Sequence, residues 1–66
     1  MKIKDVIRML QGIRYINIGD YTYVYYDYDT TINEIGYLAD DECIRIRIES
    51  HNTVTLVTAE PPVLIF

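Results

Sequence analysis

The C-terminal half of the chain carries two runs in which apolar and polar residues alternate, separated by a short polar segment. The apolar positions are Ile44, Ile46 and Ile48 in the first run and Val54 and Leu56 in the second. A period of two is typical of strands with one buried face, so we predict a hairpin over residues 43–58. The isoleucines of its first strand are expected to point into the core.

The polar segment between the two runs is Ser50-His51-Asn52. A two-residue turn at this place would put the apolar sides of the two strands on different faces of the sheet. We therefore expect a three-residue loop that ends with Asn52 in the left-handed conformation, which asparagine tolerates. That loop pairs Ile46 with Leu56.

The N-terminal segment has the apolar period of a helix. Its apolar residues fall at i, i+3, i+4 and i+7, and they are Ile3, Val6, Ile7 and Leu10. We predict a helix over residues 3–11, closed by Gly12. A helix of this length is unstable alone, so its apolar stripe is expected to pack on a sheet.

A second hairpin is predicted over residues 13–28, turning at Gly19-Asp20 in a type II′ turn. This turn pairs Ile18 with Tyr21 and Ile16 with Tyr23. Both faces of the resulting hairpin are apolar or aromatic. An exposed surface of this kind usually marks a contact site.

The acidic connector, residues 29–42, interrupts the strand pattern. Thr31 and Glu34 have capping-box spacing, and we expect a short helical turn over residues 36–40 with Tyr37 tucked inward.

In the apolar tail, residues 59–66, Pro61-Pro62 prevents a central strand. The tail ends in four apolar residues that either cover the core of their own subunit or join a neighbouring one, and we predict them as an oligomer interface: Val63, Leu64, Ile65 and Phe66.

These elements define the α+β class: one small domain over residues 1–66, with an N-terminal helix packed on an antiparallel sheet of two hairpins. A chain of 66 residues buries only about 60% of its unfolded surface, and oligomerisation is a common remedy. We therefore expect a homodimer or larger assembly.

The single cysteine, Cys43, cannot form an intramolecular disulfide, and no signal-peptide or membrane-spanning run is found, which favours the cytoplasm.

Three short segments resemble the small orphan proteins encoded by bacteriophages and mobile elements of Gram-positive bacteria. They are Ile3-Lys4-Asp5-Val6, Tyr37-Leu38-Ala39-Asp40 and the isoleucine-rich strand ahead of His51-Asn52. Lys2 and Gly36 stand where the pattern of that group has Thr and Pro. The resemblance implies an accessory protein that acts in the host cytoplasm, and it implies no catalytic residue.

Charge is unevenly distributed along the chain. The formal net charge is −4, and residues 16–42 contain seven acidic residues with no lysine or arginine. Acidic residues interspersed with tyrosines suit a basic partner, although such a face can also serve solubility alone. The predicted partner-binding residues are Tyr21, Tyr23, Tyr26, Asp27, Tyr28, Asp29, Asp40, Asp41 and Glu42. Nucleic acid is disfavoured as a direct partner, because base-stacking tyrosines require a positively charged groove.

Candidate catalytic and metal-binding residues are sparse. His51 is the only histidine and lies in a predicted loop, while Asp40, Asp41 and Glu42 lack the spacing of a calcium loop. We expect no catalytic residue, no metal and no cofactor.

Two functions follow from these patterns. The first is a non-enzymatic binding protein that blocks a basic host protein or ribonucleoprotein, for example a counter-defence factor such as an anti-CRISPR protein. The second is a homo-oligomer that holds a small anionic ligand, such as a nucleotide, between its subunits.

Overall fold

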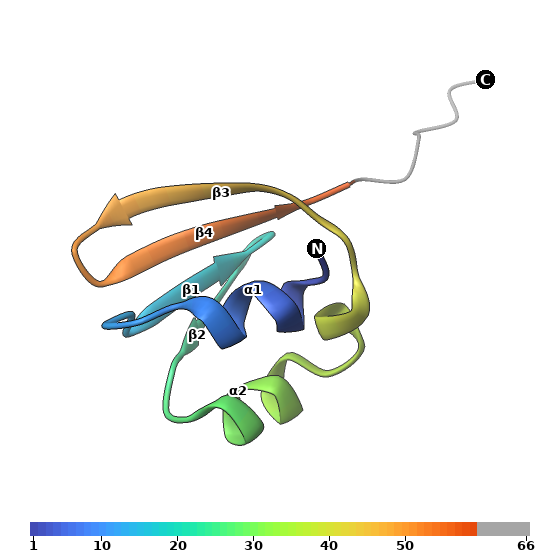
Figure 1. The fold of residues 1–66 in the computed structure, drawn as a ribbon, viewed down its shortest axis with the longest axis horizontal. Coiled ribbons are helices and arrows are strands. Elements are labelled where there is room, and N and C mark those ends of the chain that lie inside the picture. The colour runs from blue at the N-terminus through green and yellow to red at the C-terminus, as the bar shows by residue number, and fades with distance from the viewer. Residues whose placement is uncertain (60–66) are drawn as a thin grey trace.

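The computed structural model describes residues 1–59, so the predicted tail interface over Val63, Leu64, Ile65 and Phe66 lies outside the described residues. The elements in chain order are helix α1 (Ile3–Met9), strands β1 (Tyr15–Ile18) and β2 (Tyr21–Val24), helix α2 (Tyr28–Ile35), the 3₁₀ helix η1 (Gly36–Asp40), and strands β3 (Cys43–Ser50) and β4 (Thr53–Thr58). Figure 1 shows the helices on one side of a four-stranded sheet. The predicted α+β class is confirmed.

The sheet is mixed, whereas the sequence predicted an antiparallel one. Its order is β2-β1-β4-β3: the two hairpins are antiparallel, and they join where β1 pairs with β4 in parallel. The composition of the second hairpin explains this arrangement. β4 contains no charged residue and takes a central place, whereas β3 carries Arg45, Arg47 and Glu49 and takes the edge.

The core lies between one face of the sheet and the helices. Its members come from α1, α2, η1, β1 and β4, and they are Ile3, Val6, Ile7, Ile16, Ile18, Ile35, Ala39, Val54 and Leu56. The predicted apolar stripe of the N-terminal helix is therefore confirmed for Ile3, Val6 and Ile7, whereas Leu10 is only partly buried. α1 ends at Met9, two residues before the predicted end, with Leu10 as its C-cap, so the prediction that Gly12 closes the helix was wrong.

The first hairpin has the predicted register, with Ile18 opposite Tyr21 and Ile16 opposite Tyr23. Gly19 has φ +60°, as the first central position of a II′ turn requires. The strands are shorter than predicted, because β2 ends at Val24 and Tyr28 already belongs to α2.

The second hairpin pairs Ile46 with Leu56 as predicted, but through a different turn. Ser50 pairs with Thr53, so His51 and Asn52 form the two-residue turn that the sequence argument had excluded. An irregularity between Ile48 and Ser50 restores the common facing of the apolar residues. Among the described residues only glycines have a positive φ, so the prediction that Asn52 is left-handed was wrong.

The isoleucines of β3 share a face with the core but are not covered by it. Ile44, Ile46 and Ile48 are 62%, 45% and 71% exposed, whereas their neighbours Val54 and Leu56 on β4 are fully buried. The prediction that the β3 isoleucines are buried was wrong. β3 is the edge strand, and Figure 1 shows α1 and α2 lying toward the β1 and β2 side of the sheet.

The acidic connector contains the predicted helical turn over residues 36–40, which is η1, and in addition a full helix, α2, that was not predicted. α2 begins after Asp27, whose carboxylate accepts a hydrogen bond from the backbone N–H of Thr30 at 2.8 Å. Thr31, predicted as the cap, is buried within α2, and its Oγ1 accepts a hydrogen bond from the backbone N–H of Tyr26. Tyr37 was predicted to tuck inward and is instead 84% exposed.

Candidate functional site

The predicted partner-binding carboxylates do not form one equivalent set. Asp27 serves the fold, because its two oxygens accept hydrogen bonds from the backbone N–H of Thr30 at 2.8 Å and from the Thr30 hydroxyl at 3.0 Å. These hydrogen bonds lower the pKa of Asp27 below its ordinary value. Its charge is therefore directed into the first turn of α2.

Asp40 and Glu42 are used to attach η1 and the following loop to the N-terminal segment. The ammonium of Lys4 lies 3.0 Å from the Asp40 carboxylate, and the amino group of Met1 pairs with Glu42. The hydrogen bond from Lys4 lowers the pKa of Asp40, and the same contact raises the pKa of Lys4. Both pairs are solvent-exposed, so they position these segments more than they stabilise them.

Three carboxylates of α2 and the residue after η1 have neither an ion pair nor a side-chain hydrogen bond to any residue in 1–59: Asp29, Glu34 and Asp41. Asp29 and Glu34 are exposed on α2, and Asp41 directly follows η1. Two tyrosines of the same stretch of chain, Tyr26 and Tyr37, are 66% and 84% exposed. We call these five residues the acidic surface.

Two members of the acidic surface, Glu34 and Tyr37, were absent from the predicted set. Glu34 was assigned to a capping box, and Tyr37 was assumed to continue the buried face of a helix. Gly36, with φ +70°, breaks the helical phase between α2 and η1 and lets Tyr37 point outward. A glycine directly before Tyr37 is the signal in the sequence that could have indicated this.

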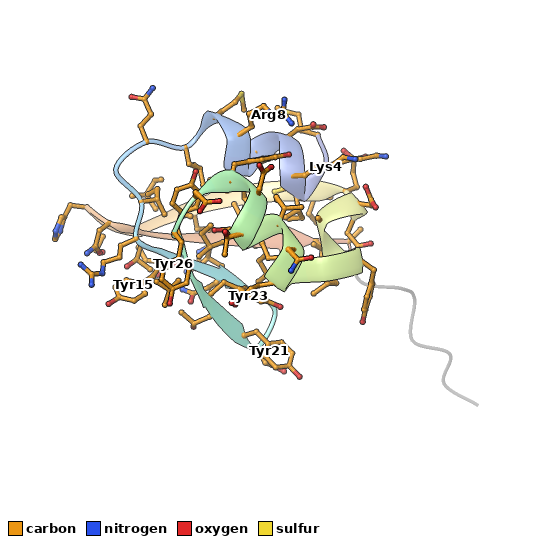
Figure 2. The ribbon with its side chains drawn as sticks, turned by 90° about the horizontal axis from the view of Figure 1, so that it is seen from below. Lys4, Arg8, Tyr15, Tyr21, Tyr23 and Tyr26 are labelled. Atoms are coloured by element: carbon orange, nitrogen blue, oxygen red, sulfur yellow. The ribbon has the colours of Figure 1, made fainter. Side chains whose placement is uncertain are left out.

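The tyrosines predicted to bind a partner divide into two groups. Tyr21 is 68% exposed and lies at the rim of the molecule in Figure 2, with its ring 6.5 Å from that of Tyr23. Tyr23 and Tyr28 are half-buried and pack against the core. The Tyr28 hydroxyl accepts a hydrogen bond from Arg8 at 3.1 Å, and the Arg8 guanidinium lies 4.6 Å from the ring centre. Tyr28 therefore joins α2 to α1 and is only partly accessible.

The face of the sheet opposite the helices has a different character. Thr22, Asn17 and Thr55 form a hydrogen-bonded row across β2, β1 and β4, with distances of 2.7 and 3.2 Å. The next strand adds Arg45 and Arg47, which alternate with the isoleucines and so lie on this face. Arg45 and Arg47 thus lie on the face away from the helices, whereas Lys4 and Arg8 lie on α1.

A shallow apolar groove runs between α1 and β3. Its volume is about 220 Å³, and it is lined by Met1, Val6, Cys43, Ile44, Arg45 and Ile46. The exposed isoleucines of β3 continue this groove along the edge of the sheet. The groove has no pair of facing carboxylates or nucleophiles, and its chemistry is that of an apolar contact.

Within residues 1–59 no three histidine, cysteine, aspartate or glutamate side chains are grouped so that they could hold a metal ion. His51 is exposed in the turn between β3 and β4. No helix in this part of the chain is long and apolar enough to cross a membrane.

Comparison with known proteins gave no match to a family model, to a curated protein or to a solved structure.

Proposed function

We propose that this chain is a non-enzymatic binding protein whose acidic surface contacts a basic protein or ribonucleoprotein. One observation carries the proposal: Tyr37 is 84% exposed, and the exposed carboxylates that precede and follow it in the sequence, Glu34 and Asp41, have no ion pair with any described residue. An exposed tyrosine supplies rigid apolar contact area with a polar tip, and unpaired carboxylates around it suit lysine and arginine side chains.

The resemblance to small phage and mobile-element proteins adds the biological setting of the proposal. A protein of that kind acts in the cytoplasm of the host and blocks a host macromolecule, as a counter-defence inhibitor such as an anti-CRISPR protein does. Many host complexes that bind nucleic acid expose lysine and arginine, and such surfaces are complementary to the acidic surface.

The test is affinity capture from a bacterial lysate with the tagged full-length chain, quantified by mass spectrometry at low and at physiological salt. The test variant reverses Asp29, Glu34 and Asp41 to lysine and leaves Asp27 and Asp40 in their structural contacts. We expect the parent to retain a basic protein or ribonucleoprotein, and the triple variant to lose it while its circular dichroism stays native. Nuclease treatment of the lysate shows whether capture depends on nucleic acid.

Matched controls separate this surface from net charge alone. Asp20→Lys changes one charge at the exposed β1–β2 turn, and Asp29→Lys makes the same change on the acidic surface. We expect Asp29→Lys to weaken capture more than Asp20→Lys does, and Tyr37→Ala to weaken it without any change in charge. Capture that is equal for the parent and the triple variant would contradict the proposal.

The second candidate function, a homo-oligomer with a small anionic ligand, is favoured by one observation. Arg45 and Arg47 lie on the uncovered face of the sheet, and within residues 1–59 only Glu49 pairs with one of them, Arg47, at 3.5 Å. Native mass spectrometry of the purified protein tests it. A retained nucleotide or other anion that is lost in Arg45→Ala would move this candidate ahead of the first.

A further inference from the structure

The edge strand β3 combines two features that soluble monomers avoid. It is eight residues long, and within the described chain it has a hydrogen-bonding neighbour, β4, on one side only. Its three isoleucines are between 45% and 71% exposed. Long apolar edge strands pair readily with other strands, and natural proteins normally shorten, charge or cover them.

The strand at the other edge of the sheet, β2, is shorter than β3 and contains no isoleucine. It is only four residues long. Its residue Tyr23 is half-buried and packs against the core. The exposed pair of the strand, Tyr21 and Thr22, have hydroxyl groups that water can solvate. β3 is therefore the edge that most requires a partner.

The sequence of β3 is suited to antiparallel pairing with a second copy of itself. Its ladder to β4 is regular from Arg45 to Ile48 and irregular on either side, so self-pairing must be centred within this stretch. A centre between Ile46 and Arg47 would set an isoleucine opposite an arginine and put the isoleucine rows of the two copies on different faces of the joined sheet. Of the centres on a single residue, Ile46 and Arg47 each leave seven of the eight residues of β3 facing the second copy, whereas Arg45 and Ile48 would leave five, so the first two are compared.

Charge decides between these two registers. Centring on Ile46 sets Arg45 opposite Arg47 of the second copy, twice by symmetry, and like charges directly opposite each other are destabilising. Centring on Arg47 sets Arg45 opposite Glu49 of the second copy, again twice. It also sets Ile46 opposite Ile48 on the apolar face. One pair of like charges remains, Arg47 opposite Arg47 of the second copy, and its repulsion is reduced because each Arg47 contacts Glu49 of its own strand at 3.5 Å.

We propose that two copies of this chain form a symmetric dimer by antiparallel pairing of their β3 strands, centred on Arg47, and that the two sheets become one. The backbone groups of both edges are then hydrogen-bonded, and Ile46 and Ile48 of the two copies become cross-strand neighbours. The acidic surface lies on α2 and η1 and takes no part in this contact. A test that contradicts the dimer would therefore not contradict the proposed function, and the reverse also holds.

The experiment is sedimentation equilibrium and light scattering on the full-length chain between about 1 and 100 μM, with three charge variants. Arg45→Glu and Glu49→Arg each create like pairs at both ends of the seam, and we expect the dimer dissociation constant to rise roughly three- to tenfold for each. The exchange of both residues, Arg45→Glu with Glu49→Arg, restores opposite charges and should restore the affinity of the parent. Arg14→Glu, the same charge change outside β3, should leave the affinity unchanged.

Each outcome of this series bears on the proposal. A parent chain that is monomeric at 100 μM overturns it, as does an exchange variant that binds no better than the two single variants. If Arg45→Glu strengthens the dimer, the register centred on Ile46 is the correct one and the proposed register is wrong. If Ile65→Asp dissociates the dimer while Ile48→Asp leaves it intact, the contact lies in the apolar tail and not on β3.

Discussion

Asp27 shows how a single residue can look like a binding residue and yet serve the fold. In the sequence it is one acid within an acidic, tyrosine-rich block. In the structure its carboxylate caps α2 through Thr30. Its neighbour in the block, Asp29, has no ion pair with any residue in 1–59. Spacing alone did not separate the two, because the capping box was assigned to Thr31, four residues after Asp27, the residue that caps α2.

The cap predicts a specific dependence of stability on pH. The fold lowers the pKa of Asp27, so its stabilisation is fully present above the ordinary pKa of an aspartate. That stabilisation is lost as the pH falls through the lowered pKa of the folded state. Asp27→Asn keeps a capping side chain without the charge, and Asp27→Ala removes the cap.

We therefore expect Asp27→Ala to lower the melting temperature at pH 7 by a few degrees, and Asp27→Asn to lower it less. Thermal unfolding followed by circular dichroism between pH 2 and pH 7 measures both. The difference between the parent and Asp27→Asn should shrink as the pH falls below about 4. A difference that is constant over this range would mean that the charge of Asp27 does not contribute to the fold.

At the scale of elements, the strands and the first helix were predictable because a buried face imposes a period. The start of β3, the bounds of β4 and the pairing of Ile46 with Leu56 were predicted from alternation and a common apolar face, whereas β3 extends to Ser50, which was predicted in the loop. Alternation does not determine the place of a strand in the sheet, and so it did not show that β4 is central and β3 is at the edge. Nor could it show the bulge near Glu49, which made a two-residue turn compatible with the common facing.

The place of each strand predicts opposite results for two paired residues. Leu56 is fully buried, and Leu56→Asp would put an unpaired carboxylate into the core at a cost of several kcal/mol, against a total stability of about 5 kcal/mol. That variant should be unfolded. Ile46 is 45% exposed, and Ile46→Asp should cost about 1 kcal/mol and leave the fold intact.

Urea unfolding at about 1 μM protein, where association is weakest, is the measurement for this pair. Leu56→Ala is a milder control that should lose about 2–5 kcal/mol. If Ile46→Asp unfolds the chain as Leu56→Asp does, then β3 is covered in solution even at this concentration, and the isoleucine face belongs to the core of a tighter assembly.

At the scale of the whole molecule, the sheet separates two surfaces. The helical side presents Asp29, Glu34 and Asp41, and the opposite side presents Arg45 and Arg47. The sequence shows acidic residues gathered in residues 16–42, and their role in binding a partner stays a prediction. Which carboxylates are engaged in contacts, and which apolar residues remain exposed, depends on the packing of distant segments, and no local pattern contains that information.

A dimer built on β3 makes stability depend on protein concentration. Partners that bind the folded chain and not the unfolded chain stabilise it by mass action, so the melting temperature of the parent should rise by several degrees between 1 and 100 μM. Ile48→Asp places a charge opposite Ile46 of the second copy, and because Ile48 is 71% exposed it should leave the single folded chain intact. The melting temperature of this variant should be the same at both concentrations and should match that of the parent at high dilution. A parent whose melting temperature does not change over this hundredfold range is a folded monomer, and its exposed isoleucine strand is then stable in water without a second copy.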